Sequence, residues 1–186
     1  MNNTRIRTTE RQRSRHHNRL LAAAAAVLVV AAGVAIASAA SGGSPDPTYA
    51  RTGEINAMGM PVIETPGTAS GTAAVNGITA TPSTWALGRV PLNVAVRPTW
   101  TIQNDATDEV TIGEPHAQVN EGCCPGAFTL QGSDTLTPGS EAELTFELSM
   151  HPGMDGAHDM TVHVPIQRAD GTTDTLTLNV AGNFRD

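Results

Sequence analysis

Apolar and polar residues alternate with a period of two along the second half of the chain. Between Glu141 and Met150 every even-numbered position is apolar and every odd-numbered position is polar. The alternation recurs over residues 94–102, 160–166 and 176–180. A period of two places successive side chains on opposite faces of a strand. No helical period appears after residue 41, so we predict that this part of the chain is all-β.

Turn-forming residue pairs separate these runs, at positions 104–105, 138–139, 152–153 and 170–171. About seven short strands with one apolar face each are typical of an Ig-like β-sandwich. We predict that fold for residues 74–184. Pro98 lies within the first run and indicates an edge strand or a bulge, because proline has no N–H to donate to a neighbouring strand.

The segment Leu20–Ala40 carries no charge, and six of the eleven arginines precede it. As a helix it would be about 30 Å long, enough to span a bilayer core. We predict that residues 1–19 form a basic cytoplasmic tail, that residues 20–40 anchor the chain in the cell membrane, and that the rest lies outside the cytoplasm. A cleaved signal peptide is the open alternative, since residues 35–37 and 37–39 both form small-x-small cleavage sites. The protein would then be secreted.

The body of the chain is acidic, with five arginines and seventeen carboxylates from Ser41 onward and no lysine. This balance argues against nucleic acid as a partner, which requires a basic surface. Residues 41–73 are rich in Ser, Gly, Pro, Thr and Ala, and we predict a flexible linker there. Its apolar segment, residues 58–63, is interpreted as a patch that docks on the domain or near the membrane. A metal clamp formed by Met58-Gly59-Met60 is the less favoured interpretation.

Four motifs occur in an order that resembles exported bacterial Ig-like domains of unknown function, which carry a Cys-Gly-Cys loop in mid-domain. They are Leu87-Gly88-Arg89-Val90-Pro91, Trp100-Thr101-Ile102-Gln103-Asn104, Gly122-Cys123-Cys124 and Thr137-Pro138-Gly139. The resemblance covers roughly residues 74–182, and this chain departs from it by having adjacent cysteines. It implies the fold and no activity, because the family has no assigned chemistry.

Soft metal ligands are concentrated in two turn-rich segments of the chain. The candidate ligands are Cys123, Cys124, His151, Met154, His158 and His163. Thiolate, thioether and imidazole together favour copper as Cu(I), and zinc is possible through Cys and His. The turns at 152–153 and 155–156 should bring the ligands at 151, 154 and 158 together. The two segments flank the strand predicted at 141–150, so a single site requires the fold to return both to one end.

The adjacent cysteines constrain the possible chemistry. Consecutive Cα atoms are about 3.8 Å apart, below the roughly 4.4 Å minimum of an ordinary disulfide. We therefore expect a strained disulfide or a metal-bound pair at Cys123 and Cys124. No motif of a known catalytic class is present, so no enzyme activity is predicted. The predicted function is a membrane-tethered, non-enzymatic Ig-like binding module whose loop binds a soft metal, with copper as the candidate, or an unidentified protein partner. A thiol-redox accessory and a purely structural or adhesive domain are the alternatives.

Overall fold

The computed structural model describes residues 49–186, and all regular structure in this range is β-strand. No helix within residues 49–186 is long and apolar enough to cross a membrane. The predicted tail (1–19) and the predicted membrane or signal segment (20–40) lie outside the described residues, as does the start of the predicted linker.

The chain order of the strands is β1 (Arg51–Ile55), β2 (Pro61–Ile63), β3 (Thr68–Ser70), β4 (Ala73–Val75), β5 (Ile78–Thr81), β6 (Thr84–Val90), β7 (Val94–Val96), β8 (Thr99–Asn104), β9 (Val110–Ile112), β10 (His116–Glu121), β11 (Phe128–Gln131), β12 (Thr135–Leu136), β13 (Glu141–Phe146), β14 (Leu148–Met150), β15 (Gly156–Arg168) and β16 (Thr173–Phe184).

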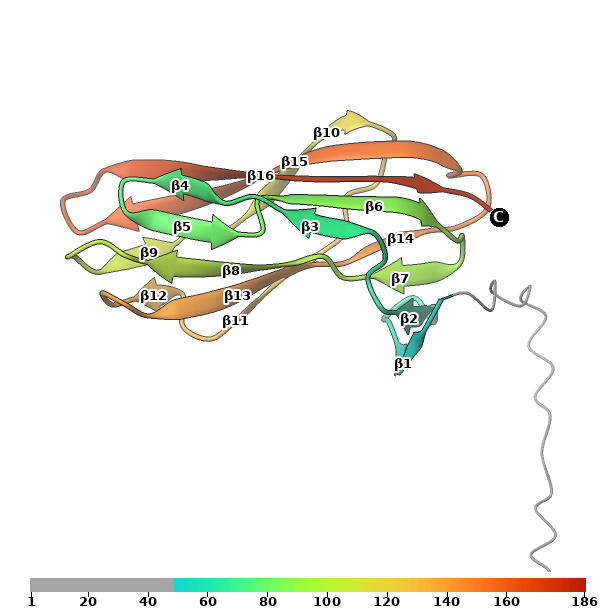
Figure 1. The fold of residues 1–186 in the computed structure, drawn as a ribbon, viewed down its shortest axis with the longest axis horizontal. Coiled ribbons are helices and arrows are strands. Elements are labelled where there is room, and N and C mark those ends of the chain that lie inside the picture. Colours follow the sequence, from blue (N-terminus) through green and yellow to red (C-terminus); the bar gives the residue numbers. More distant parts are fainter. Residues whose placement is uncertain (1–48) are drawn as a thin grey trace, which may run out of the picture. The chain divides into compact units, whose positions relative to one another are not determined.

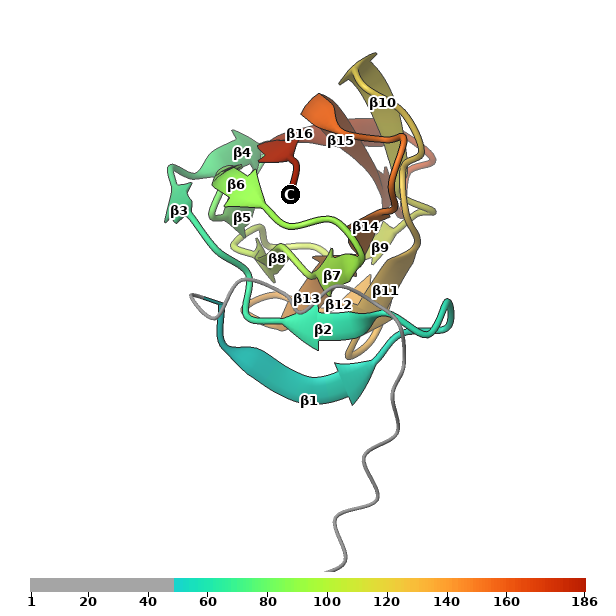
Figure 2. The same ribbon diagram turned by 90° about the vertical axis from the view of Figure 1, so that its right-hand side faces the viewer.

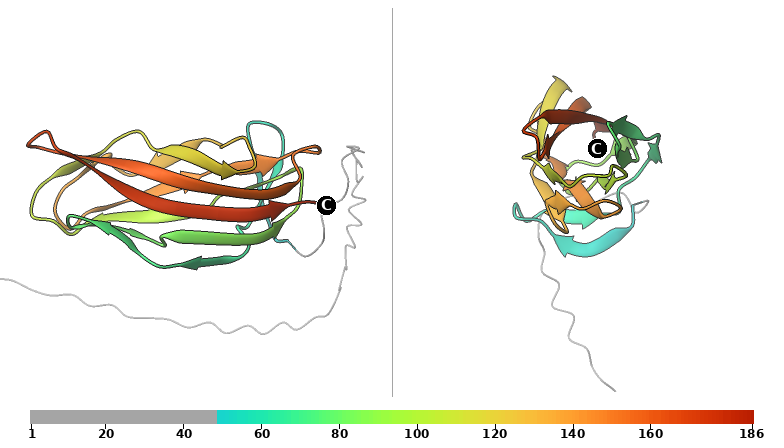
Figure 3. Two further views of the ribbon diagram at one scale, coloured as in Figure 1. Left: turned by 90° about the horizontal axis from the view of Figure 1, so that it is seen from above. Right: turned by 90° about the vertical axis from the view of Figure 1, so that its left-hand side faces the viewer.

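Two larger sheets form the layers of a sandwich (Figures 1 and 2). One has the order β12-β9-β15-β16-β6-β3, with β10 also paired to β15, and Figure 3 shows its long β15–β16 hairpin from above. The other has the order β11-β13-β8-β5-β4. A smaller sheet, β1-β2-β7-β14, continues the second layer towards the end of the domain where β16 finishes.

The alternating apolar side chains fill the space between the layers. In the run from Glu141 to Met150, all five even-numbered side chains are buried, as the alternation predicts. They share one core with β8 in their own layer and with β15 and β16 in the opposite layer. Burial of each large apolar side chain contributes about 1.5–3 kcal/mol, so this shared core is the main source of stability. The prediction of an all-β sandwich is confirmed.

The structure has more strands than the roughly seven predicted, and two of the extra strands arise because two of the runs change sheet midway. The run over 94–102 breaks at Pro98 into β7 and β8, and the run over 141–150 breaks at Glu147 into β13 and β14. At Pro98 the chain passes from the four-stranded to the five-stranded sheet, and at Glu147 it passes back to the four-stranded sheet. The Phe146 N–H donates to the Pro98 carbonyl at 3.0 Å, which keeps the two breaks side by side.

The flexible linker predicted for residues 41–73 is not found between residues 51 and 70, which form β1, β2 and β3. The reason is the apolar pair Val62 and Ile63, which is buried against the domain. β2 pairs with β7 through the register Val62↔Ala95, so this segment is part of a sheet. The interpretation of residues 58–63 as a docking patch is confirmed for β2.

Candidate metal-binding site

The loop between β10 and β11, residues 122–127, carries both cysteines and is called the cysteine loop below. Its first residue, Gly122, has a φ of +86°, and a Cβ there would approach Cδ2 of His158 to 2.5 Å. Glycine therefore allows the loop to pass directly beside the His158 ring. Cys124 also has a left-handed conformation, with a φ of 57°. Both cysteines are free thiols, so the strained disulfide is not formed.

Cys123, in the cysteine loop, faces His158 of β15. Its Sγ lies 4.0 Å from Nε2 of His158, whose Nδ1 lies 3.2 Å from the carbonyl oxygen of Gly156. A carbonyl only accepts, so a neutral ring making this bond carries its proton on Nδ1 and leaves a lone pair on Nε2. His158 is buried and meets the edge of Phe184. The imidazole is thus fixed with its acceptor nitrogen towards the thiol.

The Cys123 thiol itself is perturbed by its neighbour. A hydrogen bond with Cys124 raises the pKa of Cys123, and desolvation raises it further. Cys123 therefore carries less thiolate at a given pH than an isolated cysteine.

A cavity of about 320 Å³ is lined by residues 124–127 of the cysteine loop and by residues of two other segments. Four potential metal ligands line this sulfur cavity: Met58, Cys124, His151 and Met154. They come from three separate segments, namely the turn between β1 and β2, the cysteine loop, and the turn after β14. The last turn is closed by the Met154 N–H, which donates to the His151 carbonyl at 3.0 Å. The cavity thus gathers one thiol, one imidazole and two thioethers.

Five of the six predicted ligands lie in two groups in the structure. Cys124, His151 and Met154 line the sulfur cavity, while Cys123 faces His158. The sequence predicted that His158 would lie in a tight loop with His151. Instead, β15 begins at Gly156 and places His158 on a strand. Within the described residues, no three His, Cys, Asp or Glu side chains form a group that could hold a metal ion. The candidate site therefore depends on methionine.

His163 lies away from both groups. It is five residues beyond His158 on β15, or about 16 Å along an extended strand. There it is opposite His116 of β10, and the two rings stack with centroids 5.1 Å apart. The prediction that His163 joins the other ligands is not supported by this geometry, because the long β15 strand separates it from them.

Met58 also lines the sulfur cavity, although the sequence favoured no metal-binding role for it. The Met-Gly-Met motif gave a signal, but spacing alone did not show that residue 58 would reach a cysteine 66 positions further along the chain. The position of Met58 at the cavity depends on how the β1–β2 hairpin packs on the sandwich.

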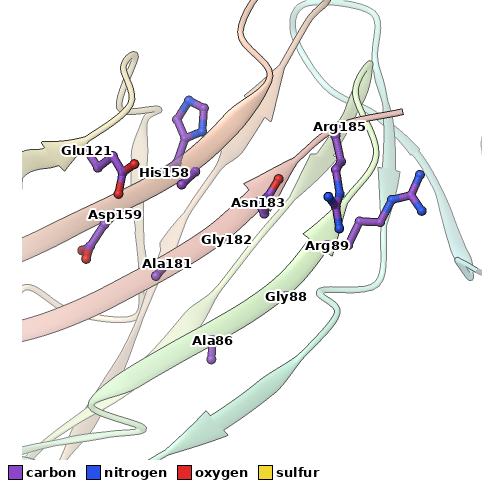
Figure 4. Close-up of a pocket in the computed structure, with 11 residues that line it drawn as sticks. Ala86, Gly88, Arg89, Glu121, His158, Asp159, Ala181, Gly182, Asn183 and Arg185 are labelled. Carbon is purple, nitrogen blue, oxygen red and sulfur yellow. The ribbon is translucent and has the colours of Figure 1, made fainter.

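A second hollow, of about 420 Å³, crosses β6, β15 and β16 (Figure 4). Glu121 and Asp159 lie at one end near His158, and Arg89 and Arg185 lie at the other. The hollow is open, carries both signs of charge and has no sulfur ligand in its lining. It therefore offers no second set of soft metal ligands.

No protein-family model and no curated protein sequence matches this chain. Similar solved structures include the VesB protease of Vibrio cholerae, at 15% identity and a TM-score of 0.45 over 58% of this chain and 32% of the protease chain. The ASH/PapD-like domain 7 of human CEP192 has 10% identity and a TM-score of 0.44, over 58% of this chain and 84% of that chain. The periplasmic chaperone SfaE has 13% identity and a TM-score of 0.44, over 57% of this chain and 56% of that chain. The chain thus spans about a third of VesB and just over half of SfaE. These likenesses carry no activity or partner over to this protein.

Proposed function

We propose that this protein is a membrane-tethered, extracytoplasmic Ig-like module that binds copper as Cu(I) and is not an enzyme. The observation that carries the proposal is the sulfur cavity, where Cys124 lies together with His151 and Met154 although four strands, β11 to β14, separate them in sequence. Cys123, the neighbour of Cys124 in the same loop, faces His158, so this pair adds two further potential donors.

The chemistry of these donors favours Cu(I). Thiolate and thioether are soft ligands that select Cu(I), whereas calcium and magnesium require oxygen ligands. Zinc accepts thiolate and imidazole but is seldom bound by thioether. Thiolate and imidazole bind only when deprotonated, so copper affinity should fall as the pH decreases.

The tether and the location are proposed from the sequence, because residues 20–40 are uncharged and follow an arginine-rich segment. A reporter that is active only outside the cytoplasm, fused after Asp186, should be active. Activity of a cytoplasmic reporter at the same position, with the first reporter silent, would contradict this orientation.

Copper analysis of the full-length chain tests the metal function. The protein is purified anaerobically in mild detergent, loaded with Cu(I) and separated from weakly bound metal. We expect about one tightly bound copper per chain. Cys124→Ser should weaken binding by at least about 100-fold, because even changes outside the ligand shell cost about 10- to 100-fold. His163→Ala is the matched control, since it removes a predicted ligand that lies away from the cavity.

Two results would overturn the copper proposal. One is a wild-type protein with no copper above background. The other is an equal loss in Cys124→Ser and His163→Ala, because a specific cavity site cannot depend on a residue elsewhere on β15.

A thiol-redox function is the second candidate, favoured by the two adjacent free cysteines of the cysteine loop. Thiol counting on freshly isolated protein distinguishes the two. A metal-binding pair is recovered as two free thiols, whereas a redox pair is recovered partly as a strained disulfide that a mild reductant opens.

A further inference from the structure

The turn that carries Met58 is organised by a buried asparagine. Asn56 is only 7% exposed, and its Oδ1 accepts hydrogen bonds from the backbone N–H groups of Met58 and Met60, at 3.0 and 2.8 Å. The Asn56 N–H donates to the Met60 carbonyl at 2.9 Å. Gly59 closes the turn with a φ of +81°. The backbone at Met58 is therefore held by its own turn, although the segment is short.

The same asparagine fixes the turn to the sandwich. Its Nδ2 donates to Oε1 of Glu147 at 3.0 Å, across 91 residues of sequence. The other carboxylate oxygen, Oε2, accepts from Nε of Arg97 at 3.0 Å, and Arg97 also pairs with Glu54 of β1. The hydrogen bond to Glu54, together with that to Glu147, raises the pKa of Arg97, so this guanidinium stays charged. The Glu147 carboxylate thus holds the turn directly through Asn56, and it holds strand β1 through Arg97.

Glu147 also positions the cysteine loop, through its backbone. Its N–H donates to the Ala127 carbonyl at 2.9 Å. Its carbonyl oxygen lies 1.5 Å from the position that a Cβ on Gly126 would occupy. One residue therefore sets the place of two segments, the turn with Met58 and the loop with Cys124.

Core packing does not account for the Met58 side chain. Met58 is 62% exposed, and it is not among the apolar side chains that pack on the core. Its neighbour Met60 is partly buried and does not line the sulfur cavity. A long apolar side chain held at the surface of a cavity that already contains a thiol, an imidazole and a thioether is better explained by a ligand role.

We infer that Met58 is a copper ligand, whose thioether completes a four-ligand Cu(I) site with Cys124, His151 and Met154. This inference rests on the proposed copper function. Three sulfur donors and one nitrogen favour Cu(I) over Cu(II) and over zinc. The β1–β2 hairpin then serves as an arm that brings in the last ligand, and Glu147 acts as a positioning residue through Asn56.

Met58→Leu tests this role, because leucine keeps the approximate volume and removes the sulfur. Met60→Leu makes the same chemical change in the same turn, outside the cavity lining. Cu(I) affinity of the full-length chain is measured by competition with a coloured Cu(I) chelator. We expect Met58→Leu to weaken binding by about 10-fold or more, and Met60→Leu to stay within about 3-fold of wild type. Asn56→Ala should weaken binding as well, and should add little to Met58→Leu because both disrupt the same contact.

A second measurement uses the unchanged protein. With methionine methyl groups labelled with carbon-13, Ag(I) serves as a spectroscopically silent analogue of Cu(I). Addition of Ag(I) should shift the Met58 and Met154 methyl signals and leave Met60 in place. Wild-type affinity retained in Met58→Leu, or an unshifted Met58 signal while Ag(I) binds, would overturn the inference and leave the copper function standing. Failure of the wild-type chain to bind either ion would overturn the copper function itself.

Discussion

Gly126→Ala should lower the free energy of unfolding by about 3 kcal/mol or more and displace the cysteine loop. The added Cβ would lie 1.5 Å from the Glu147 carbonyl oxygen and 2.7 Å from its carbon. Backbone atoms of this junction cannot move aside freely, because the Glu147 N–H is bonded to the Ala127 carbonyl. Urea unfolding gives the stability, and chelator competition on the same samples gives the Cu(I) affinity, which should also fall.

Gly139→Ala is the matched control for this substitution. Gly139 has a φ of +81°, and a Cβ there would meet no atom within 4 Å. Alanine at this position is strained without a collision and should cost about 1–2 kcal/mol, with copper affinity unchanged. Equal stability losses in the two variants would show that the close approach of Gly126 to Glu147 has no special role.

Phe146→Ala should lower the free energy of unfolding by about 3–5 kcal/mol. The Phe146 side chain is fully buried and stacks on Phe128 of the neighbouring strand, with ring centroids 4.4 Å apart. Removing it leaves a cavity where β13 passes into β14. A domain of this size is stable by only about 5–15 kcal/mol, so the variant should lose a large part of its stability. The measurement is the urea midpoint at an unchanged slope.

Glu143→Ala on the same strand provides the comparison. Glu143 is exposed on the opposite face of β13 and should change stability by no more than about 0.5 kcal/mol. A loss below about 1 kcal/mol for Phe146→Ala would mean that the core between the two layers is packed differently from the structure described above.

The core could be predicted from the sequence because strand parity depends only on local order. Leu144 and Leu178 lie in different layers, yet the alternation of their own segments places both side chains inside. Parity even survives the break at Glu147, since a single residue separates Phe146 from Leu148 and both remain buried. The number of strands was not predictable in this way. Sheet changes at Pro98 and Glu147 depend on pairing between distant segments.

The sequence predicted which kinds of residue form the candidate site, but it predicted their arrangement in space only in part. The soft donors Cys124, His151 and Met154 were recognised from the sequence, and the fold returns them to one cavity. His163 does not line this cavity, because the length of β15 sets its distance from His158. The place of Met58 at the cavity could not be predicted, because it depends on a hydrogen bond between Asn56 and Glu147, 91 residues away.

X-ray absorption at the copper edge of the Cu(I)-loaded full-length chain is a direct test of the proposed Cu(I) site, because it identifies the atoms bound to the metal. We expect the edge shape of Cu(I) and a first shell dominated by sulfur, with three sulfur atoms and one nitrogen. Met58→Leu should lose one sulfur from that shell, whereas Met60→Leu should leave it unchanged. A first shell made only of nitrogen and oxygen would contradict the account.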